Sequence, residues 1–239
     1  HHACIRATFG QRDLHPFGER GQRPGARDLD RAVEAQVRRA RETAARTAAG
    51  AVAKCLLREF GIEAVGFVAE LGPIRAAIPT ETSADRLRAL RDANEMYCPD
   101  DSVIDAMMAH IRQAKIDKDT VGGIVETRVF DIPIGLGSCW SSTQKLDGRL
   151  MQAVGSIQAF KGAEIGLGFD AARLPGSQVH DAIYFDVAQR QTPNFGFVRK
   201  TNRAGGLEGG MTNGMPLVVR GAMKPISTLL QGMDSVNLQ

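Results

Sequence analysis

The chain has 239 residues, of which 43% are hydrophobic and 24% are charged, and its formal net charge is +3 at pH 7. These values are ordinary for a globular protein that buries a substantial core. No apolar run approaches the roughly 18 residues that a membrane span needs. The sequence also shows no apolar signal segment at its beginning. We therefore expect a cytoplasmic protein with no membrane partner.

The cysteines and histidines show no metal-binding or disulfide pattern. Cys4, Cys55, Cys98 and Cys139 are more than 40 residues apart from one another and form no C-x-x-C pair. Zinc knuckles and disulfide frameworks need closer or paired spacings, and the five histidines show no ligand spacing either. The sequence therefore predicts no metal site, and a reducing compartment is the default.

Residues 1–39 are interrupted by glycine and proline and show no sustained apolar period, which is typical of a loop or a disordered arm. The first 50 residues contain ten arginines and six acidic residues, and this excess of positive charge makes contact with nucleic acid an alternative. Without interleaved aromatic residues or a known motif, we expect no nucleic-acid partner. The first residue is not methionine, so we expect that something upstream is missing.

A long helix is predicted from Leu29 to Phe60, because this stretch is rich in Ala, Arg, Glu and Leu. Asp28 or Asp30 can cap its beginning, and Gly61 stands where a C-terminal cap is expected. Alanines on one side form a small-residue face suited to close packing. We expect the helix to be buried.

The next stretch predicts a strand at 62–72, a loop with a short helix at 84–93, and an amphipathic helix at 101–118. The methionines of that amphipathic helix are expected in the core rather than around a cofactor. A second strand is predicted at 122–132, because Pro133 cannot continue a ladder. A glycine turn, G-L-G-S, follows at 135–138.

Later residues predict a helix at 144–157 and strands at 163–169 and 195–199. Strands separated by helices favour a mixed α/β fold over an all-α one. The stretch G-L-G-F-D-A at 166–171 satisfies the dinucleotide fingerprint, but Pro175-Gly176 would break the helix that the motif requires. We therefore exclude a dinucleotide-binding unit there.

The segment 199–228 is the most informative part of the chain. Six glycines lie between Gly205 and Gly221, and basic residues are interleaved with them. Glycine turns present concave rows of N–H groups that bind anions, and nearby Arg or Lys adds charge. The alternative is a glycine-rich β-hairpin. A buried strand is predicted at 215–223, ended by Lys224-Pro225.

The order of residues in this segment resembles chorismate synthase. The matching stretches within it are T-N-R-A-G-G-L-E-G-G-M-T-N-G and A-M-K-P-I-S-T. Earlier matching stretches are R-A-R-E-T-A-A-R-T-A-A-G, I-P-I-G-L-G-S, K-L-D-G-R-L followed by K-G-A-E-I-G-L-G-F, and G-S-Q-V-H-D. They occur in the family's order over residues 40–228. The resemblance implies an α+β fold, a β-α-β sandwich with helices between antiparallel sheets, assembled as a homotetramer. Residues 40–239 would form the FMN-binding core and residues 1–39 a poorly matching arm.

The resemblance also implies a reaction. The family converts 5-enolpyruvylshikimate 3-phosphate to chorismate and phosphate in the shikimate pathway of aromatic amino acid biosynthesis. It uses reduced FMN, which lends an electron transiently as the C–O bond breaks, and NADPH is a candidate reductant. By carry-over, the FMN contacts are Gln158, Ala159, Gly209, Lys224, Pro225, Ile226, Ser227 and Thr228. Arg41 would face the anionic groups of the substrate.

The sequence also departs from the family pattern. The family's histidine motifs, G-E-S-H-G and a G-H-A-D-like stretch, and its C-terminal R-x-D-P-C-like motif are absent, so no catalytic residue is assigned. Val37-Arg38-Arg39 stands where the family has R-[SA]-S at the flavin. We therefore keep a second hypothesis, in which a fragment, a misread gene or a degenerate paralogue serves as a non-catalytic oligomeric scaffold that binds flavin or a phosphorylated metabolite.

Overall fold

A computed structural model describes residues 26–80, 82–227 and 229–230, with side chains from Ala40 onward. The chain divides into two compact units, residues 1–61 and residues 62–239. The loop or disorder expected for residues 1–25 lies outside the described residues. No helix in the described part is long and apolar enough to cross a membrane.

The described part of the first unit is one long helix, α2 (Ala26–Glu59). Gly61, with φ of 72°, follows its end, and the Gly61 amide donates to the carbonyl oxygen of Arg58 at 2.9 Å. A left-handed glycine at this position closes the last turn without a Cβ clash. The expected helix and its C-terminal glycine are confirmed, and residues 26–39 are helical rather than loop. The N-terminal cap expected at Asp28 or Asp30 is wrong, because the helix already begins at Ala26 and both residues lie inside it. The expected boundary at residue 39 itself stays a prediction.

The expectation that this helix is buried is wrong for the chain by itself. From Ala40 to Phe60 the side chains are exposed, apart from Thr47, Lys54 and Leu57, which are half-buried. Sequence periodicity shows that a helix has an apolar or small-residue side, but it does not show what covers that side.

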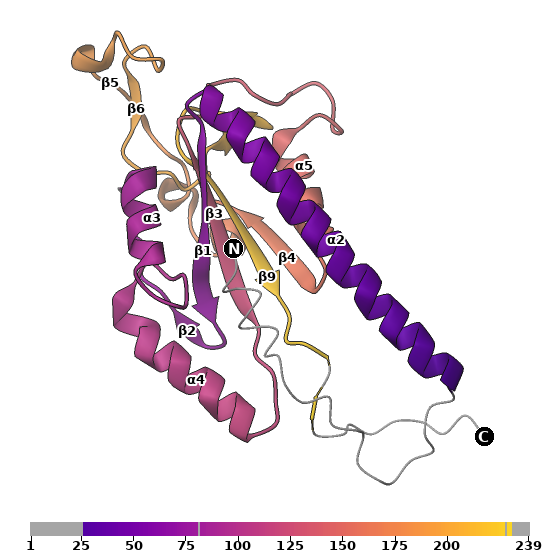
Figure 1. The fold of residues 1–239 in the computed structure, drawn as a ribbon. Coiled ribbons are helices and arrows are strands. Elements are labelled where there is room, and N and C mark those ends of the chain that lie inside the picture. The colour runs from indigo at the N-terminus through magenta and orange to yellow at the C-terminus, as the bar shows by residue number, and fades with distance from the viewer. Residues whose placement is uncertain (1–25, 81, 228, 231–239) are drawn as a thin grey trace. The chain divides into compact units, whose positions relative to one another are not determined.

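The second unit is built on a five-stranded sheet in the order β2-β1-β3-β9-β4, in which all neighbours are antiparallel (Figure 1). Its strands are β1 (Glu63–Leu71), β2 (Ile74–Arg75), β3 (Gly123–Phe130), β4 (Phe160–Ile165) and β9 (Leu217–Met223). Helices combined with antiparallel strands confirm the α+β class. The strands predicted at 62–72, 122–132 and 215–223 are confirmed to within a few residues.

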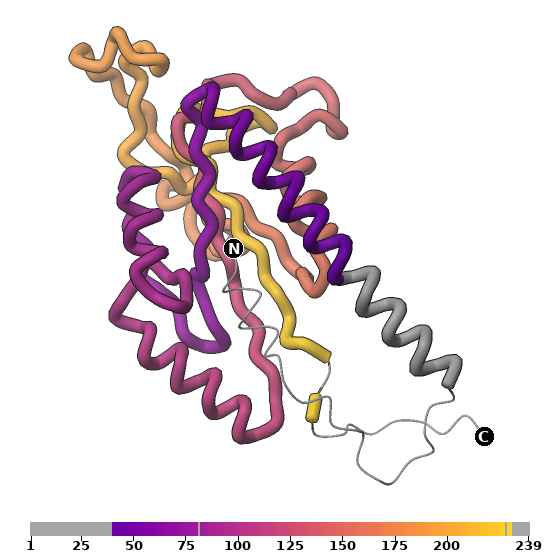
Figure 2. Tube along the Cα trace, in the orientation of Figure 1, coloured from indigo at the N-terminus to yellow at the C-terminus, as the bar shows by residue number. Residues whose placement is uncertain are grey.

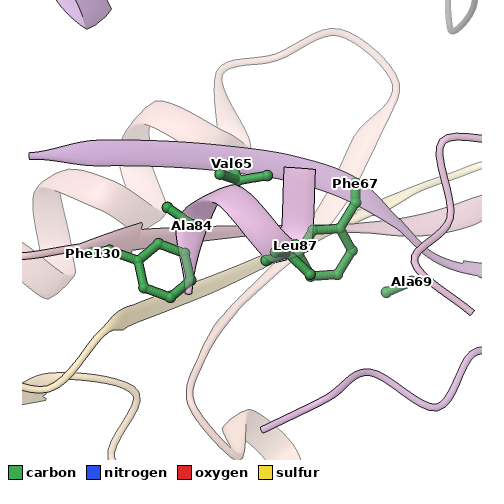
Figure 3. Close-up of a cluster of buried hydrophobic side chains, with 6 residues drawn as sticks. All are labelled: Val65, Phe67, Ala69, Ala84, Leu87 and Phe130. Carbon is green, nitrogen blue, oxygen red and sulfur yellow. The ribbon is translucent and has the colours of Figure 1, made fainter. Parts of the chain in front are cut away.

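One face of the sheet packs against α3 (Ala84–Asp92). Figure 3 shows the side chains of Val65 and Phe67 from β1 and Phe130 from β3 around Ala84 and Leu87 of the helix. The helix α4 (Ile104–Ile116) follows a short 3-10 turn (Asp101–Val103) and contributes Met107, which is fully buried. The predicted core role of the methionines is therefore confirmed for Met107.

The opposite face of the sheet packs against α5 (Leu146–Gly155). Leu150 and Val154 of this helix lie on Leu217 and Val219 of β9. Gly221 completes the contact, because a Cβ there would lie 2.5 Å from the ring of Phe160. Because side chains alternate along a strand, Leu217, Val219 and Gly221 of β9 all lie on the α5 side of the sheet.

Four short strands form two further pairs. β5 (Ile183–Phe185) pairs with β6 (Phe197–Arg199), and β7 (Leu207–Glu208) pairs with β8 (Met211–Thr212). Figure 2 traces the chain from β4 through these pairs to β9. Three 3-10 turns lie on this path: Gly168–Arg173 and Gly176–Gln178 between β4 and β5, and Val187–Gln189 between β5 and β6.

The strand predicted at 163–169 lies further upstream than expected. β4 begins at Phe160 and ends at Ile165, because Gly166 and Gly168 take φ values of 60° and 58° and turn the chain. A 3-10 turn, not an α-helix, follows the G-L-G-F-D-A stretch. The α-helix that the dinucleotide motif requires therefore does not follow this stretch.

Candidate functional site

The beginning of the glycine-rich segment is held by the buried carboxylate of Asp181. This carboxylate accepts hydrogen bonds from the Thr201 hydroxyl, from the Arg203 amide at 3.0 Å and from the Ala204 amide at 2.9 Å. Burial by itself raises the pKa of Asp181, but the hydrogen bonds from Ala204, Thr201 and Arg203 together outweigh it and lower that pKa below the ordinary value. Asp181 is therefore charged at neutral pH and fixes the path of residues 201–204.

Two asparagines close the turns that follow. Asn202 accepts from the Gly206 amide at 2.8 Å and donates to the carbonyl oxygen of Pro216 at 2.7 Å. Asn213 accepts from the Met215 amide at 3.0 Å. Asparagine suits these positions because its side chain offers both an acceptor and a donor to nearby main-chain groups.

The strands β7 and β8 are joined by Gly209-Gly210. Both glycines have positive φ, 61° and 86°, as a tight two-residue hairpin turn requires. The β-hairpin alternative is therefore confirmed for this part of the segment. Gly210 is packed, since a Cβ there would lie 2.7 Å from the Ser138 carbonyl oxygen, whereas a Cβ at Gly209 would meet nothing within 4 Å. Gly209 thus presents its backbone to open space.

The glycine turn predicted at 135–138 lies against this hairpin. Thr212 organises the contact: its hydroxyl accepts from the Leu136 amide at 2.9 Å, and its own amide donates to the Leu136 carbonyl oxygen at 2.9 Å. The Leu146 amide at the start of α5 donates to the carbonyl oxygen of Gly210 at 2.9 Å. The hairpin turn is thereby attached to the beginning of α5.

Two arginines of this segment, Arg199 and Arg220, are used internally. Arg220 donates to the carbonyl oxygen of Gly166 at 2.9 Å and pairs with Glu164 at 3.0 Å. Arg199 pairs with Glu208 at 2.7 Å. Arg220 therefore stabilises the turn after β4 rather than facing an anion, which corrects one part of the anion-site hypothesis.

A second cluster forms where β4 and β9 meet. The Lys224 amide donates to the carbonyl oxygen of Ala159 at 3.0 Å, and Phe160 pairs with Met223 in the sheet. Ala159 has φ of 69°, which is unusual for a residue with a Cβ. Further along, the Thr120 hydroxyl donates to the Ile226 carbonyl oxygen at 2.7 Å. These bonds fix the backbone on both sides of Lys224-Pro225.

The structure brings most of the assigned residues together but not all of them. Gln158 and Ala159 lie beside the segment from Lys224 to Ser227, and Gln158, Lys224, Pro225, Ile226 and Ser227 are exposed. Gly209 lies at the other end of α5, and a helix of that length spans about 15 Å. Arg41 is an exposed residue of α2 in the first unit, and Thr228 lies outside the described residues. The ligand roles of all these residues stay predictions.

Sequence reasoning missed two residues that shape these clusters. The motif G-S-Q-V-H-D contained Asp181, yet no role followed from it, because its hydrogen-bond partners lie some twenty residues later. Thr120 gave no signal at all. Among the described residues, no group of three or more His, Cys, Asp or Glu side chains could hold a metal ion.

The fold and the Ala159–Lys224 cluster define an α+β protein in which two segments distant in sequence meet, with the side chain of Lys224 exposed. A family model described as chorismate synthase matches residues 23–239. The chain belongs to the chorismate synthase family.

Individual relatives agree with this assignment. A chorismate synthase of Desulforamulus reducens is 48% identical over 226 residues, which are 91% of this chain and 57% of that protein. One of Geobacter sulfurreducens is 49% identical over 227 residues, 91% of this chain and 58% of that protein. A crystal structure of chorismate synthase has a TM-score of 0.71 at 41% identity, covering 78% of this chain and 56% of that one. The chain thus spans somewhat more than half the length of these relatives.

Proposed function

We propose that this chain supplies the flavin-binding part of a chorismate synthase, a carbon–oxygen lyase. The reaction is the conversion of 5-enolpyruvylshikimate 3-phosphate to chorismate and phosphate with reduced FMN, within the shikimate pathway. The membership of the family supports the reaction class. The observation that carries the location of the site is the contact between Ala159 and Lys224.

This contact joins two segments that the family resemblance assigns to the same cofactor. Ala159 has a strained left-handed conformation, and its carbonyl oxygen accepts a hydrogen bond from the Lys224 amide. Strained residues persist where the surrounding structure holds them, and they cluster at ligand sites. Two segments that are distant in sequence and meet at such a residue favour a binding site.

The exposed side chains of the cluster fit a phosphorylated flavin. The ammonium group of Lys224 would attract a phosphate, and the Ser227 hydroxyl would donate a hydrogen bond to it. The bond from Thr120 to Ile226 holds the backbone between these two residues. Reduced FMN supplies the electron-rich ring that eases loss of the phosphate, while the protein supplies orientation and charge.

Other parts of the proposal follow the family resemblance. Arg41 is proposed to meet the anionic groups of the substrate, Gly209 and Thr228 to contact the flavin, and NADPH to serve as the reductant. The protein is proposed to be cytoplasmic and to assemble as a homotetramer through its own copies, without nucleic-acid or membrane partners.

Titration of the purified chain with FMN, with 5-enolpyruvylshikimate 3-phosphate present, tests the site by flavin fluorescence and absorbance. We expect saturable binding that Lys224→Ala weakens about tenfold or more, because charge-assisted hydrogen bonds contribute about 1.5–3 kcal/mol. Lys115→Ala, at an exposed lysine in the last turn of α4, is the matched control and should leave the affinity unchanged.

Release of chorismate under reducing conditions then separates the two hypotheses. Binding together with chorismate release supports the lyase. Binding without release supports the non-catalytic scaffold, and equal loss of affinity in the Lys224 and Lys115 variants would refute the proposed location of the phosphate.

A further inference from the structure

The Gly209-Gly210 turn between β7 and β8 leaves part of its backbone free for a ligand. Gly209 is exposed, and a Cβ there would meet nothing within 4 Å. Within the described residues, the amide and carbonyl of Gly209 make no main-chain hydrogen bond outside the hairpin itself. Glycine has no Cβ to restrict its φ and ψ angles, so the direction of these two groups depends on how the neighbouring residues are held.

The C-terminal side of the turn is held from outside the hairpin. The Gly210 carbonyl oxygen accepts hydrogen bonds from the Leu146 amide at 2.9 Å and from the Ser138 amide at 3.3 Å. The strands β7 and β8 have only two residues each, and so short a hairpin is not stable through its own ladder. The N-terminal side of the turn, at Glu208, therefore needs a support of its own.

That support comes from the side chain of Arg199, the last residue of β6. Its guanidinium donates to the Glu208 carboxylate at 2.7 Å and to the Asn213 carbonyl oxygen at 3.1 Å. The side-chain amide of Asn213 donates to the same carboxylate oxygen of Glu208 at 3.1 Å. Arg199 thus joins the residue before the turn to the residue that follows β8.

An arginine suits this place because its guanidinium is planar and presents its donors in a fixed arrangement. The Arg199 side chain is only 11% exposed. Among the described residues, no acceptor meets its buried Nε, so the bonds to Glu208 and Asn213 are the ones that hold the group. A buried charge that loses its partner is costly, which ties Arg199 to Glu208. Lysine would keep the charge but not the fixed pair of donors.

We propose that Arg199 is a positioning residue for the flavin: acting through Glu208, it fixes the direction in which the Gly209 backbone faces the cofactor. The inference rests on the proposed function, which assigns Gly209 to the flavin, and it adds a residue that touches no ligand itself. The alternative is that the pair only stabilises the fold. The Glu208 side chain is 44% exposed, and pairs with an exposed member contribute little to stability. A ligand contact that loses its support loses affinity even where the fold persists.

Hydrogen–deuterium exchange of the ligand-free chain tests the positioning directly. Arg199→Met keeps an unbranched side chain but removes the donors, and we expect the amides of residues 209–211 to exchange about tenfold faster or more. Arg173→Met is the matched control, because it breaks an exposed arginine–aspartate pair of the same 2.7 Å length outside the segment. It should leave these amides unchanged, and the amides of β3 and β9 should be unchanged in both variants. Equal exchange at 209–211 in wild type and Arg199→Met would overturn the inference.

The spectrum of bound FMN separates positioning from stability. At saturating FMN, the visible circular dichroism of the flavin should change in Arg199→Met, because the ring meets a displaced backbone. Glu208→Gln makes the same test at an exposed side chain, and we expect the same change. Lys224→Ala should weaken binding and keep the wild-type spectrum once saturated, since it acts on the phosphate. Arg199→Lys should restore the urea stability lost in Arg199→Met, because it keeps the charge, but it should not restore the spectrum.

The FMN affinities give the coupling between the two residues. Arg199→Met and Glu208→Gln should each weaken binding about tenfold, and these losses should not add in the double variant, because Arg199 acts through Glu208. A loss of about a hundredfold in the double variant, or a wild-type flavin spectrum in Arg199→Met, would overturn the role at the flavin. Wild-type chain that binds no FMN would count against the proposed function, and the exchange result would then still decide whether Arg199 positions the turn.

Discussion

Leu87 shows how much a single side chain contributes at the residue scale. It belongs to α3 and is fully buried against β1 and β3, in the cluster with Val65, Phe67 and Phe130. Leu87→Ala removes buried methyl groups and leaves a cavity, which costs about 2–5 kcal/mol. We expect a corresponding loss in the free energy of unfolding, measured by urea denaturation. Ile116→Ala, at an exposed residue of α4, should change it by less than about 0.5 kcal/mol.

Two glycines at positive φ separate backbone strain from steric contact. A Cβ at Gly206 would lie 2.6 Å from the Pro216 carbonyl oxygen, whereas one at Gly209 would meet nothing within 4 Å. Gly209→Ala therefore carries only the left-handed strain, about 1 kcal/mol, and Gly206→Ala should cost more than about 2 kcal/mol. Urea denaturation of both variants checks this order. Equal losses would show that the contact at Gly206 relaxes.

At the scale of elements, Asp181 links the 3-10 turn region after β4 to the glycine-rich segment. Its pKa is lowered in the folded state, so its hydrogen bonds stabilise the fold above the unfolded value of about 3.9. That contribution is lost as pH falls through the still lower folded value. Asp181→Asn places an amide donor among N–H donors, and we expect a loss of about 1–3 kcal/mol at pH 7.

The pH dependence distinguishes this effect from a general loss of packing. The difference between wild type and Asp181→Asn in urea denaturation should be full at pH 7 and should shrink below about pH 4. The exposed Asp105 in α4 provides a control, because Asp105→Asn should stay within about 0.5 kcal/mol at pH 7. A difference for Asp181→Asn that does not change with pH would show that the carboxylate charge is not what holds the segment.

At the scale of the whole molecule, the sheet order predicts where the second unit is most resistant to opening. β3 and β9 are central strands with hydrogen-bonded neighbours on both sides, while β5 and β6 pair only with each other. Stability varies across a structure with such burial and pairing. In hydrogen–deuterium exchange, amides of β3 and β9 should therefore exchange slowest, and those of β5 and β6 much sooner.

Local chemistry explains what the sequence determined by itself. Helix formers and Gly61 specified α2, alternating apolar residues specified β1, β3 and β9, and paired glycines specified the β7–β8 turn. These features depend on neighbours within a few residues, so they are visible in sequence. The family motifs are also local, and they predicted that the segments around Ala159 and Lys224 contact the same cofactor.

Only the tertiary structure decided which of these local pieces meet and what each charge faces. Glu126 and Arg128 stand two residues apart in β3, and both are buried as an ion pair at 2.7 Å. The hydrogen bonds of Asp181 with its partners, and that of the Lys224 amide with Ala159, join residues that are far apart in the sequence. Such contacts arise because the helices pack on the faces of the sheet and bring residues from distant parts of the chain together. The free energy of a buried charge depends on partners that sequence spacing does not show.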